Sequence, residues 1–328
     1  MKTLFNKILT LLICIFTLAC VGAKAQTTST LEEKVLPVGE FSSISVTDDF
    51  SISLVKGPFS VRLTTDKVLA PYVQVYVRSK VLYITYDSKS VPKDIKKQYK
   101  AKGVPDPVFR ATVYLPELNG ISLEDNATVM AVDEFRGGTF TMSLQDKAQV
   151  KGLKLTATSA QISMKRNSQA RVEFLLDQKA DVSTDGNANL VMSLKSADAN
   201  ITAEGSSSVS VAGETQHMNL ATAGSSKISA NEKNETTVLT MTGSSNVVLA
   251  GSALSLELST DKSANLDAIN YASKAVNANM DGGRATVNAE EELSVNIAGG
   301  SVLNYTGTPL FKIGKVMKST LAPSGTTK

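Results

Sequence analysis

Tryptophan is absent from this sequence of 328 residues, which holds only one histidine and two cysteines. Both cysteines, Cys14 and Cys20, lie in an N-terminal segment that we expect to be removed, so the mature chain holds no thiol. That excludes disulfides, thiol catalysis and cysteine-ligated zinc. A single histidine, His217, and the lack of a G-x-S-x-G motif disfavour a nucleophile–histidine–acid site. The lack of Trp weakens the case for a sugar-stacking site, although Tyr can substitute.

The N-terminal segment has the pattern of an export signal. It reads MKTLFNKILTLLICIFTLACVGAKAQ, with two early lysines, an apolar run from Ile8 to Val21 and small residues around Lys24. The run is shorter than the roughly 20 residues that a membrane-spanning helix needs. We therefore predict a signal peptide over residues 1–25, with Gln26 as the first mature residue. The alternative is cleavage before Cys20, which would then carry a lipid anchor.

The mature chain has no excess of either charge. The signal peptide takes three of the 34 basic residues and no acid, so 31 basic (34 − 3) and 31 acidic residues remain. A neutral chain argues against nucleic acid as a partner. No later run approaches membrane-spanning length, so we expect no membrane span.

A short phrase, x-x-[Ala/Ser]-x-[Val/Ile/Leu], recurs from Asp125 onwards. Nine steps cover 174 residues (299 − 125), about 19 residues each, and a unit of this size indicates a thin solenoid. Between the copies lie runs such as LKLTAT and LSVNIA that alternate apolar with polar residues, the pattern of a half-buried strand. The copies are DNATV (Asp125), DKAQV (Asp146), SQARV (Ser168), GNANL (Gly186), GSSSV (Gly205), GSSKI (Gly224), GSSNV (Gly243), KSANL (Lys262), GRATV (Gly283) and GGSVL (Gly299).

Two strands and two turns in about 19 residues fit one coil of a parallel β-helix. We predict an all-β solenoid of about ten coils, in which each position lies above its equivalent one coil earlier. The glycines then occupy the corners of the coils and the serines occupy core positions. The sequence contains no phosphate-loop motif that would give these residues a binding role instead. The stacking predicts two inward rows, one of Ser207, Ser226 and Ser245 and one of Val209, Ile228 and Val247.

The region before the repeats, residues 26–118, is richer in aromatic residues and reads as strands joined in hairpins. Residues 87–108 form a Lys-rich insertion with three prolines, which we expect to be a loop with one helical turn. Residues 119–328 then form the β-helix with a C-terminal cap, in one continuous unit. The insertion is the candidate contact for an acidic partner, through Lys89, Lys93, Lys96, Lys97, Lys100 and Lys102.

The chain resembles the putative auto-transporter adhesin, head GIN domain family. The resemblance rests on the order of FSSISVTDDFSISLVKG, VLYITY, ATVYLPELNGISLEDNATV, the GSS repeats and YTGTPLFKIGKV, from Phe41 to Val316. It implies a right-handed β-helix exported from a Gram-negative bacterium, with adhesion as the proposed role and no established enzyme activity. In the first three coils Asp125, Asp146 and Ser168 replace Gly, so we expect differently shaped corners there.

Sugar-cleaving β-helices use clustered acids, and this chain offers few. Proximity alone suggests Asp181 with Asp185 and Asp261 with Asp267, while Glu290–Glu292 reads as a solvated turn. We predict no catalytic residue, no metal site and no cofactor. The predicted function is a secreted, non-enzymatic module of the cell envelope or surface that binds a cell-surface glycan or protein. A polysaccharide-active β-helix enzyme and a purely structural envelope component are the alternatives, and the final compartment (periplasm, outer surface or medium) and oligomeric state stay open.

Overall fold

The computed structural model describes residues 30–324, so the predicted signal peptide and the alternative lipid anchor at Cys20 lie outside the described residues. The structure is almost entirely β, with 69% strand and 4% helix. Its elements in chain order are β1 (Leu31–Pro37), β2 (Ser43–Val46), β3 (Ser51–Lys56), β4 (Ser60–Asp66), a 3-10 turn η1 (Ala70–Tyr72), β5 (Val73–Arg78), β6 (Val81–Tyr86), α2 (Lys93–Lys100), β7 (Phe109–Leu115), β8 (Gly120–Leu123), β9 (Thr128–Ala131), β10 (Phe135–Arg136), β11 (Thr139–Leu144), β12 (Gln149–Met164), β13 (Gln169–Thr184), β14 (Asn189–Ala203), β15 (Ser208–Thr222), β16 (Lys227–Met241), β17 (Asn246–Ala298), β18 (Val302–Thr306), β19 (Leu310–Val316) and β20 (Thr320–Pro323).

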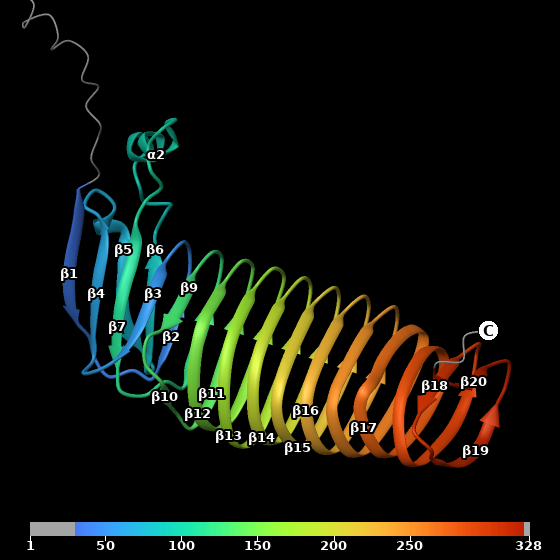
Figure 1. The fold of residues 1–328 in the computed structure, drawn as a ribbon. Coiled ribbons are helices and arrows are strands. Elements are labelled where there is room, and N and C mark those ends of the chain that lie inside the picture. The colour runs from blue at the N-terminus through green and yellow to red at the C-terminus, as the bar shows by residue number, and fades with distance from the viewer. Residues whose placement is uncertain (1–29, 325–328) are drawn as a thin grey trace, which may run out of the picture.

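The strands wind into a β-solenoid of about 11 turns, close to the ten predicted (Figure 1). Each of the strands β12 to β16 makes most of one coil and pairs in parallel with the next. Stacked coils lie about 4.8 Å apart, the ordinary spacing of paired strands. The solenoid predicted from the 19-residue interval is therefore confirmed.

The predicted inward rows are confirmed by the pairing. Val209 pairs with Ile228, and Ile228 pairs with Val247, each one coil further on. All three side chains are buried, as are Ser207, Ser226 and Ser245 in the neighbouring row. A row of small hydroxyl side chains beside a row of aliphatic ones makes a narrow, filled interior, because side chains close-pack at each level.

The corners of the coils adopt left-handed backbone conformations, which glycine enters without strain. Gly205 has a φ of 67° and Gly224 a φ of 72°, and the amide of Ser225 donates to the carbonyl of Gly205 at 2.7 Å. The expectation of differently shaped early corners is wrong for two of the three, since Asp125 and Asp146 adopt φ values of 57° and 62°.

The third copy of the phrase was placed two residues too late. Its corner is Arg166, with a φ of 62°, whereas Ser168 is a fully buried interior residue. Ala170 rather than Val172 pairs with Val150 below and Leu190 above. With this correction the coil from Arg166 has the same register as its neighbours.

The first seven strands close the N-terminal end of the solenoid. One sheet begins with the series β1, β4, β7, β3 and β9, and the other with β5, β6, β2, β8 and β11. The pairs β1–β4, β4–β7 and β5–β6 are antiparallel, unlike the coils. Phe50 packs on Phe109 with ring centroids 5.1 Å apart. Strand β1 was not expected, because its polar residues hide any alternation.

The Lys-rich insertion projects from this end of the molecule, with α2 at its tip (Figure 1). It forms a helix of eight residues rather than a single turn. Asp94 lies in the first turn and Lys97 and Lys100 in the last, where each charge favours the helix dipole. No helix among residues 30–324 is long and apolar enough to cross a membrane.

Candidate binding groove

A groove runs along one side of the solenoid across successive coils from Glu134 to Gly251. It has a volume of about 770 Å³ and adjoins a second hollow of about 570 Å³, with which it shares Leu175, Lys195, Glu214 and Lys233. This size lies in the range of natural ligand sites. We refer to the two together as the lateral groove.

The walls of the lateral groove carry rows of charged side chains, because outward positions of successive coils lie one above the other. In one row Lys154 forms ion pairs with Glu134 at 3.7 Å and with Glu173 at 3.2 Å. The hydrogen bond and charge of Glu173 raise the pKa of Lys154. In the neighbouring row Lys195 pairs with Glu214 at 3.6 Å. Such exposed pairs contribute little to stability, which leaves their charges available to a ligand.

Acids outnumber lysines along the lateral groove. Its lysines are Lys154, Lys195 and Lys233, and its acids are Glu134, Glu173, Asp177, Glu214, Glu232 and Glu235. Leu175, the ladder neighbour of Lys195, adds a half-exposed apolar side chain to the second row. The groove therefore offers both signs of charge and one apolar contact within reach of a single ligand.

Glu232 occupies an inward position of β16 and exposes 1% of its surface. Its ladder neighbours are Gly213 and Gly251, which put no side chain above or below it. Both carboxyl oxygens are buried without a hydrogen-bond partner. Burial, and secondly the charge of Glu214, raise the pKa of Glu232 from 4.5 to about 8. The carboxyl is therefore protonated and neutral at neutral pH.

A small polar network lies inside the solenoid next to Glu232. The hydroxyl of Tyr271 donates to Oδ1 of Asn234 at 2.7 Å and lies 2.7 Å from the hydroxyl of Thr237. Asn234 in turn donates to Thr215 one coil earlier. Burial raises the pKa of Tyr271 to about 12. The network pairs the hydroxyls of Thr215, Thr237 and Tyr271 but leaves Glu232, and the buried hydroxyl of Ser226 in the same coil, without a partner.

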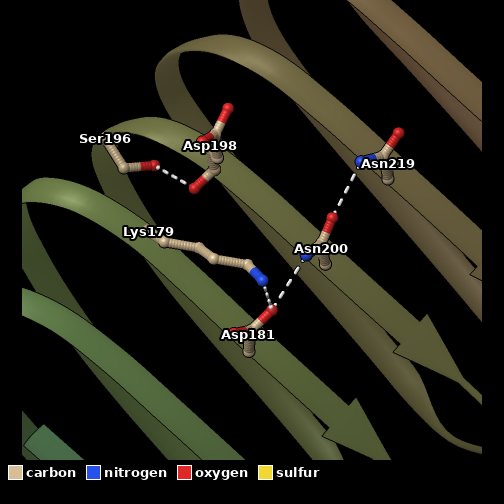
Figure 2. A network of polar contacts seen from close by, with 6 residues as sticks. All are labelled: Lys179, Asp181, Ser196, Asp198, Asn200 and Asn219. Atoms are coloured by element: carbon tan, nitrogen blue, oxygen red, sulfur yellow. Dashed lines mark hydrogen bonds and ion pairs between the residues drawn. The ribbon is translucent and has the colours of Figure 1, made fainter.

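The predicted acid pair, Asp181 with Asp185, does not form a site. Asp181 accepts a hydrogen bond from Asn200 at 2.9 Å and forms an ion pair with Lys179 at 2.9 Å. Asn219 donates to Asn200 at 2.8 Å, which extends the same row by one coil (Figure 2). Asp185 lies at the following corner, where its carboxylate accepts the amide of Gly186. Asp181 thus belongs to an amide–carboxylate row on the outer surface.

The other predicted acids and the histidine are also dispersed. Asp267 accepts an amide from its own strand, and Asp261 is exposed. Glu291 and Glu292 form ion pairs with Lys274 and Lys312. Nδ1 of His217 lies 2.8 Å from the hydroxyl of Thr236, its ladder partner one coil further on. Within residues 30–324 no group of three or more His, Cys, Asp or Glu side chains is placed to hold a metal ion.

The predicted lysines belong to the insertion that projects from the N-terminal end of the molecule (Figure 1), and none of them lines the lateral groove. All are exposed except Lys96, which is half-buried. Tyr99 anchors the helix by packing against the core, and burial together with the charge of Asp66 raises the pKa of its hydroxyl to about 12. The lysines of the insertion are Lys89, Lys93, Lys96, Lys97, Lys100 and Lys102.

A family model matches residues 40–212 and 234–309, which is most of the chain. It describes the putative auto-transporter adhesin, head GIN domain. The chain belongs to this family. The family is adhesin-like, which indicates an exported or surface protein with surface partners.

Solved structures also match the head GIN domain chain over most of its length. A putative adhesin from Parabacteroides merdae is 17% identical, with 90% of this chain and 97% of that chain covered and a TM-score of 0.33. A putative adhesin from Parabacteroides distasonis is 18% identical, with 90% and 98% covered and a TM-score of 0.34. A putative lipid binding protein from the same species is 14% identical, with 90% and 97% covered and a TM-score of 0.33. No curated protein matches the chain.

Sequence reasoning on this family member missed the lateral groove and Glu232. A signal was present, since the alternation Ile228, Ala230, Glu232 puts an acid on the inward side of a strand. Gly213 and Gly251 stand 19 residues before and after that acid, at the coil interval. An inward acid between two glycines marks a coil where the core row is interrupted.

Proposed function

We propose that the protein is a secreted, non-enzymatic module that binds an extended glycan of the bacterial cell surface along the lateral groove. The observation that supports this most directly is the direction of the groove, which follows the stacking axis. Each coil adds one more set of side chains at the same spacing. A polymer with a repeating unit meets such a surface by many weak contacts, which together give useful affinity.

The groove's side chains suit a sugar polymer. Carboxylates accept hydrogen bonds from hydroxyls, and ammonium groups donate to ring and hydroxyl oxygens. Leu175 gives an apolar contact for the face of a sugar ring. The excess of acids over lysines favours neutral or amine-bearing sugars over strongly acidic ones.

The lysines of α2 provide a separate contact for an acidic partner, either an acidic glycan or an acidic protein. They stand on a projecting helix with a local positive field on an otherwise neutral chain. Binding through them weakens with salt, because exposed charges are screened beyond about 8 Å at physiological ionic strength.

One observation favours the enzymatic alternative. Glycoside hydrolases hold one carboxylic acid with a raised pKa near a second carboxylate, and Glu232 near Glu214 has that electrostatic character. Geometry argues against it. A general acid must reach the glycosidic oxygen, and both oxygens of Glu232 are sealed from solvent. We therefore propose that Glu232 donates no proton to a substrate.

A steric block of the groove tests the proposal. Ser193 is exposed, points outward and lines the groove, so Ser193→Trp fills it without disturbing the core. Binding of the protein to purified Gram-negative envelopes and to a glycan array is measured before and after the change. We expect the change to weaken binding at least tenfold. The matched control is Ser210→Trp, which is exposed on β15 outside the groove and should bind as the wild type does.

Two results would contradict the proposal. Equal binding by the wild type, Ser193→Trp and Ser210→Trp would remove the groove as the site. Release of reducing ends or unsaturated sugars from a bound glycan, lost in Glu232→Gln, would make the enzymatic alternative correct.

A further inference from the structure

The C-terminal end of the solenoid leaves its core uncovered. Strand β19 is the last strand on its sheet and pairs with residues Glu292–Ile297 of β17. The inward residues of that β17 segment are fully buried. Their partners in β19 continue the same core row but are exposed. The exposed fraction is 38% for Phe311, 58% for Ile313 and 42% for Val316.

Two further exposed apolar side chains flank the inward residues of β19 at the same edge, and Leu310, next to Phe311, faces the outer side of the strand. Leu310 begins β19 and Met317 follows it, and both are more than half exposed. Five of the fifteen exposed large hydrophobic residues in residues 30–324 thus fall within eight consecutive positions. Such a cluster at the end of a rod marks an interaction surface rather than scattered surface residues.

The charged residues of β19, and the one just beyond it, are all lysines. No Asp or Glu follows Glu292 in the sequence, whereas Lys312, Lys315 and Lys318 lie within or just beyond β19. Glu292 is already paired with Lys312 at 2.7 Å. Lys315 and Lys318 form no ion pair with the residues that the structure describes. The surface that covers this end should therefore be apolar and anionic.

The edge of β19 is poorly suited to receive another strand. A register shift lies between Val295 and Asn296, and it leaves Gly314 out of the pairing as a bulge. Pro309 stands immediately before the strand, and lysines occupy it. Bulges, prolines and lysines are the devices that keep edge strands from pairing with other chains. A β-strand partner is thus disfavoured, although the apolar side chains remain uncovered.

We propose that this end of the rod docks on the surface of an anionic phospholipid membrane. The apolar side chains of β19 enter the boundary between headgroups and acyl chains, and Lys315 and Lys318 contact the lipid phosphates. Apolar side chains interleaved with lysines are the combination by which peripheral proteins bind anionic lipid. Docking by this end leaves the lateral groove and α2 free, since α2 lies at the opposite end (Figure 1).

The test is co-sedimentation of residues 26–328 with vesicles. These residues contain every described element and lack the predicted signal peptide. Vesicles of phosphatidylglycerol mixed with phosphatidylcholine are compared with pure phosphatidylcholine. We expect binding to the anionic vesicles only, weakened by salt. Phe311→Ser with Ile313→Ser should abolish it, and Lys315→Gln should weaken it about fivefold.

Matched controls separate this surface from others on the chain. Met130→Ser with Val132→Ser removes two exposed apolar side chains elsewhere, and Lys227→Gln removes an exposed lysine of β16 outside the groove; both should bind as the wild type. Circular dichroism checks that each variant is folded. The proposal is overturned if anionic vesicles are not bound, or if binding survives Phe311→Ser with Ile313→Ser. It is also overturned if that variant instead dissociates a lipid-free dimer, which would make the end a contact between two copies.

Discussion

Val247 and Val248 are consecutive residues of β17 that face opposite sides of the sheet, the first fully buried and the second 43% exposed. Val247 continues the core row of Ile228, whereas Val248 points to solvent. The same substitution at these two positions therefore tests the register of the coils, because the two residues are of the same type and adjacent in the chain.

Val247→Asp should destabilise the protein by about 4 kcal/mol or more, because it puts an unpaired charge into a dry core. Val248→Asp should change the free energy of unfolding by less than about 0.5 kcal/mol, as is usual for surface changes. Chemical denaturation of both variants measures the difference. Equal losses would mean that the register of the coils is wrong.

The stability of the protein should fall as pH rises from about 5 to 8, because of Glu232. Its pKa is about 8 when folded and 4.5 as a free side chain, so in this window the folded state holds a proton that the unfolded state has released. Stability is then lost at up to roughly 1.4 kcal/mol per pH unit. The groups that bear on this titration are Glu214, which raises the pKa, and the Tyr271 hydroxyl.

Glu232→Gln removes the titration while keeping a neutral side chain of the same size. We expect the variant to be more stable than the wild type at pH 8 and nearly equal to it at pH 5. Thermal unfolding across this range is the measurement, and Glu235→Gln, an exposed acid three residues on, is the control. A wild-type profile as flat as that of the variant would show that Glu232 is not held protonated.

The lysines of α2 should matter only for acidic partners. Replacing Lys93, Lys97 and Lys100 by Gln should weaken binding to an acidic polysaccharide and remove its salt dependence. Binding of a neutral glycan in the lateral groove should not change. Surface plasmon resonance at two salt concentrations distinguishes the two contacts. Salt-insensitive binding of the acidic polymer by the wild type would count against α2.

Processing at the N-terminus is a separate prediction. Mass spectrometry of the exported protein should find Gln26 as the first residue. A lipid-modified Cys20 would instead place the protein on a membrane by its N-terminal end.

The repeating part of the structure could be predicted because its physics is local and periodic. Each corner needs a left-handed residue, and two residues later each coil needs a small side chain such as Ser207. The same residue types therefore recur about every 19 residues, and this interval can be recognised in the sequence. The coil from Arg166 was misaligned because Ala170 stands where the phrase has Val, Ile or Leu, whereas SQARV, which starts at Ser168, matches the phrase.

The lateral groove could not be predicted in the same way. It depends on how outward rows such as Lys154 with Glu173 face one another across coils, which no single segment specifies. Glu232 was overlooked because an acid at an inward position breaks the pattern used to find the core. Strand β1 was missed because its polar residues hide any alternation, and its pairing with β4 is not visible in the sequence.

The predicted lack of catalysis can be tested at the acids singled out from the sequence. Glycan binding should not change when any one of these acids is replaced, in Asp181→Ala, Asp185→Ala, Asp261→Ala or Asp267→Ala. Neither the wild type nor any of these variants should cleave a glycan. Asp181→Ala should lose only the contacts to Lys179 and Asn200, a small effect on an exposed row. Chromatography of glycans after long incubation detects any cleavage.

Hydrogen–deuterium exchange of the protein bound to Gram-negative envelopes tests the groove most directly. The account predicts protection at the same place in successive coils, at residues 154–156, 173–175, 193–195, 212–214 and 231–233, which line the groove. Peptides from the opposite sheet, such as Asp181–Ser183, should exchange as in the free protein. Protection confined to other segments, or no protection in a protein that stays bound, would contradict the account.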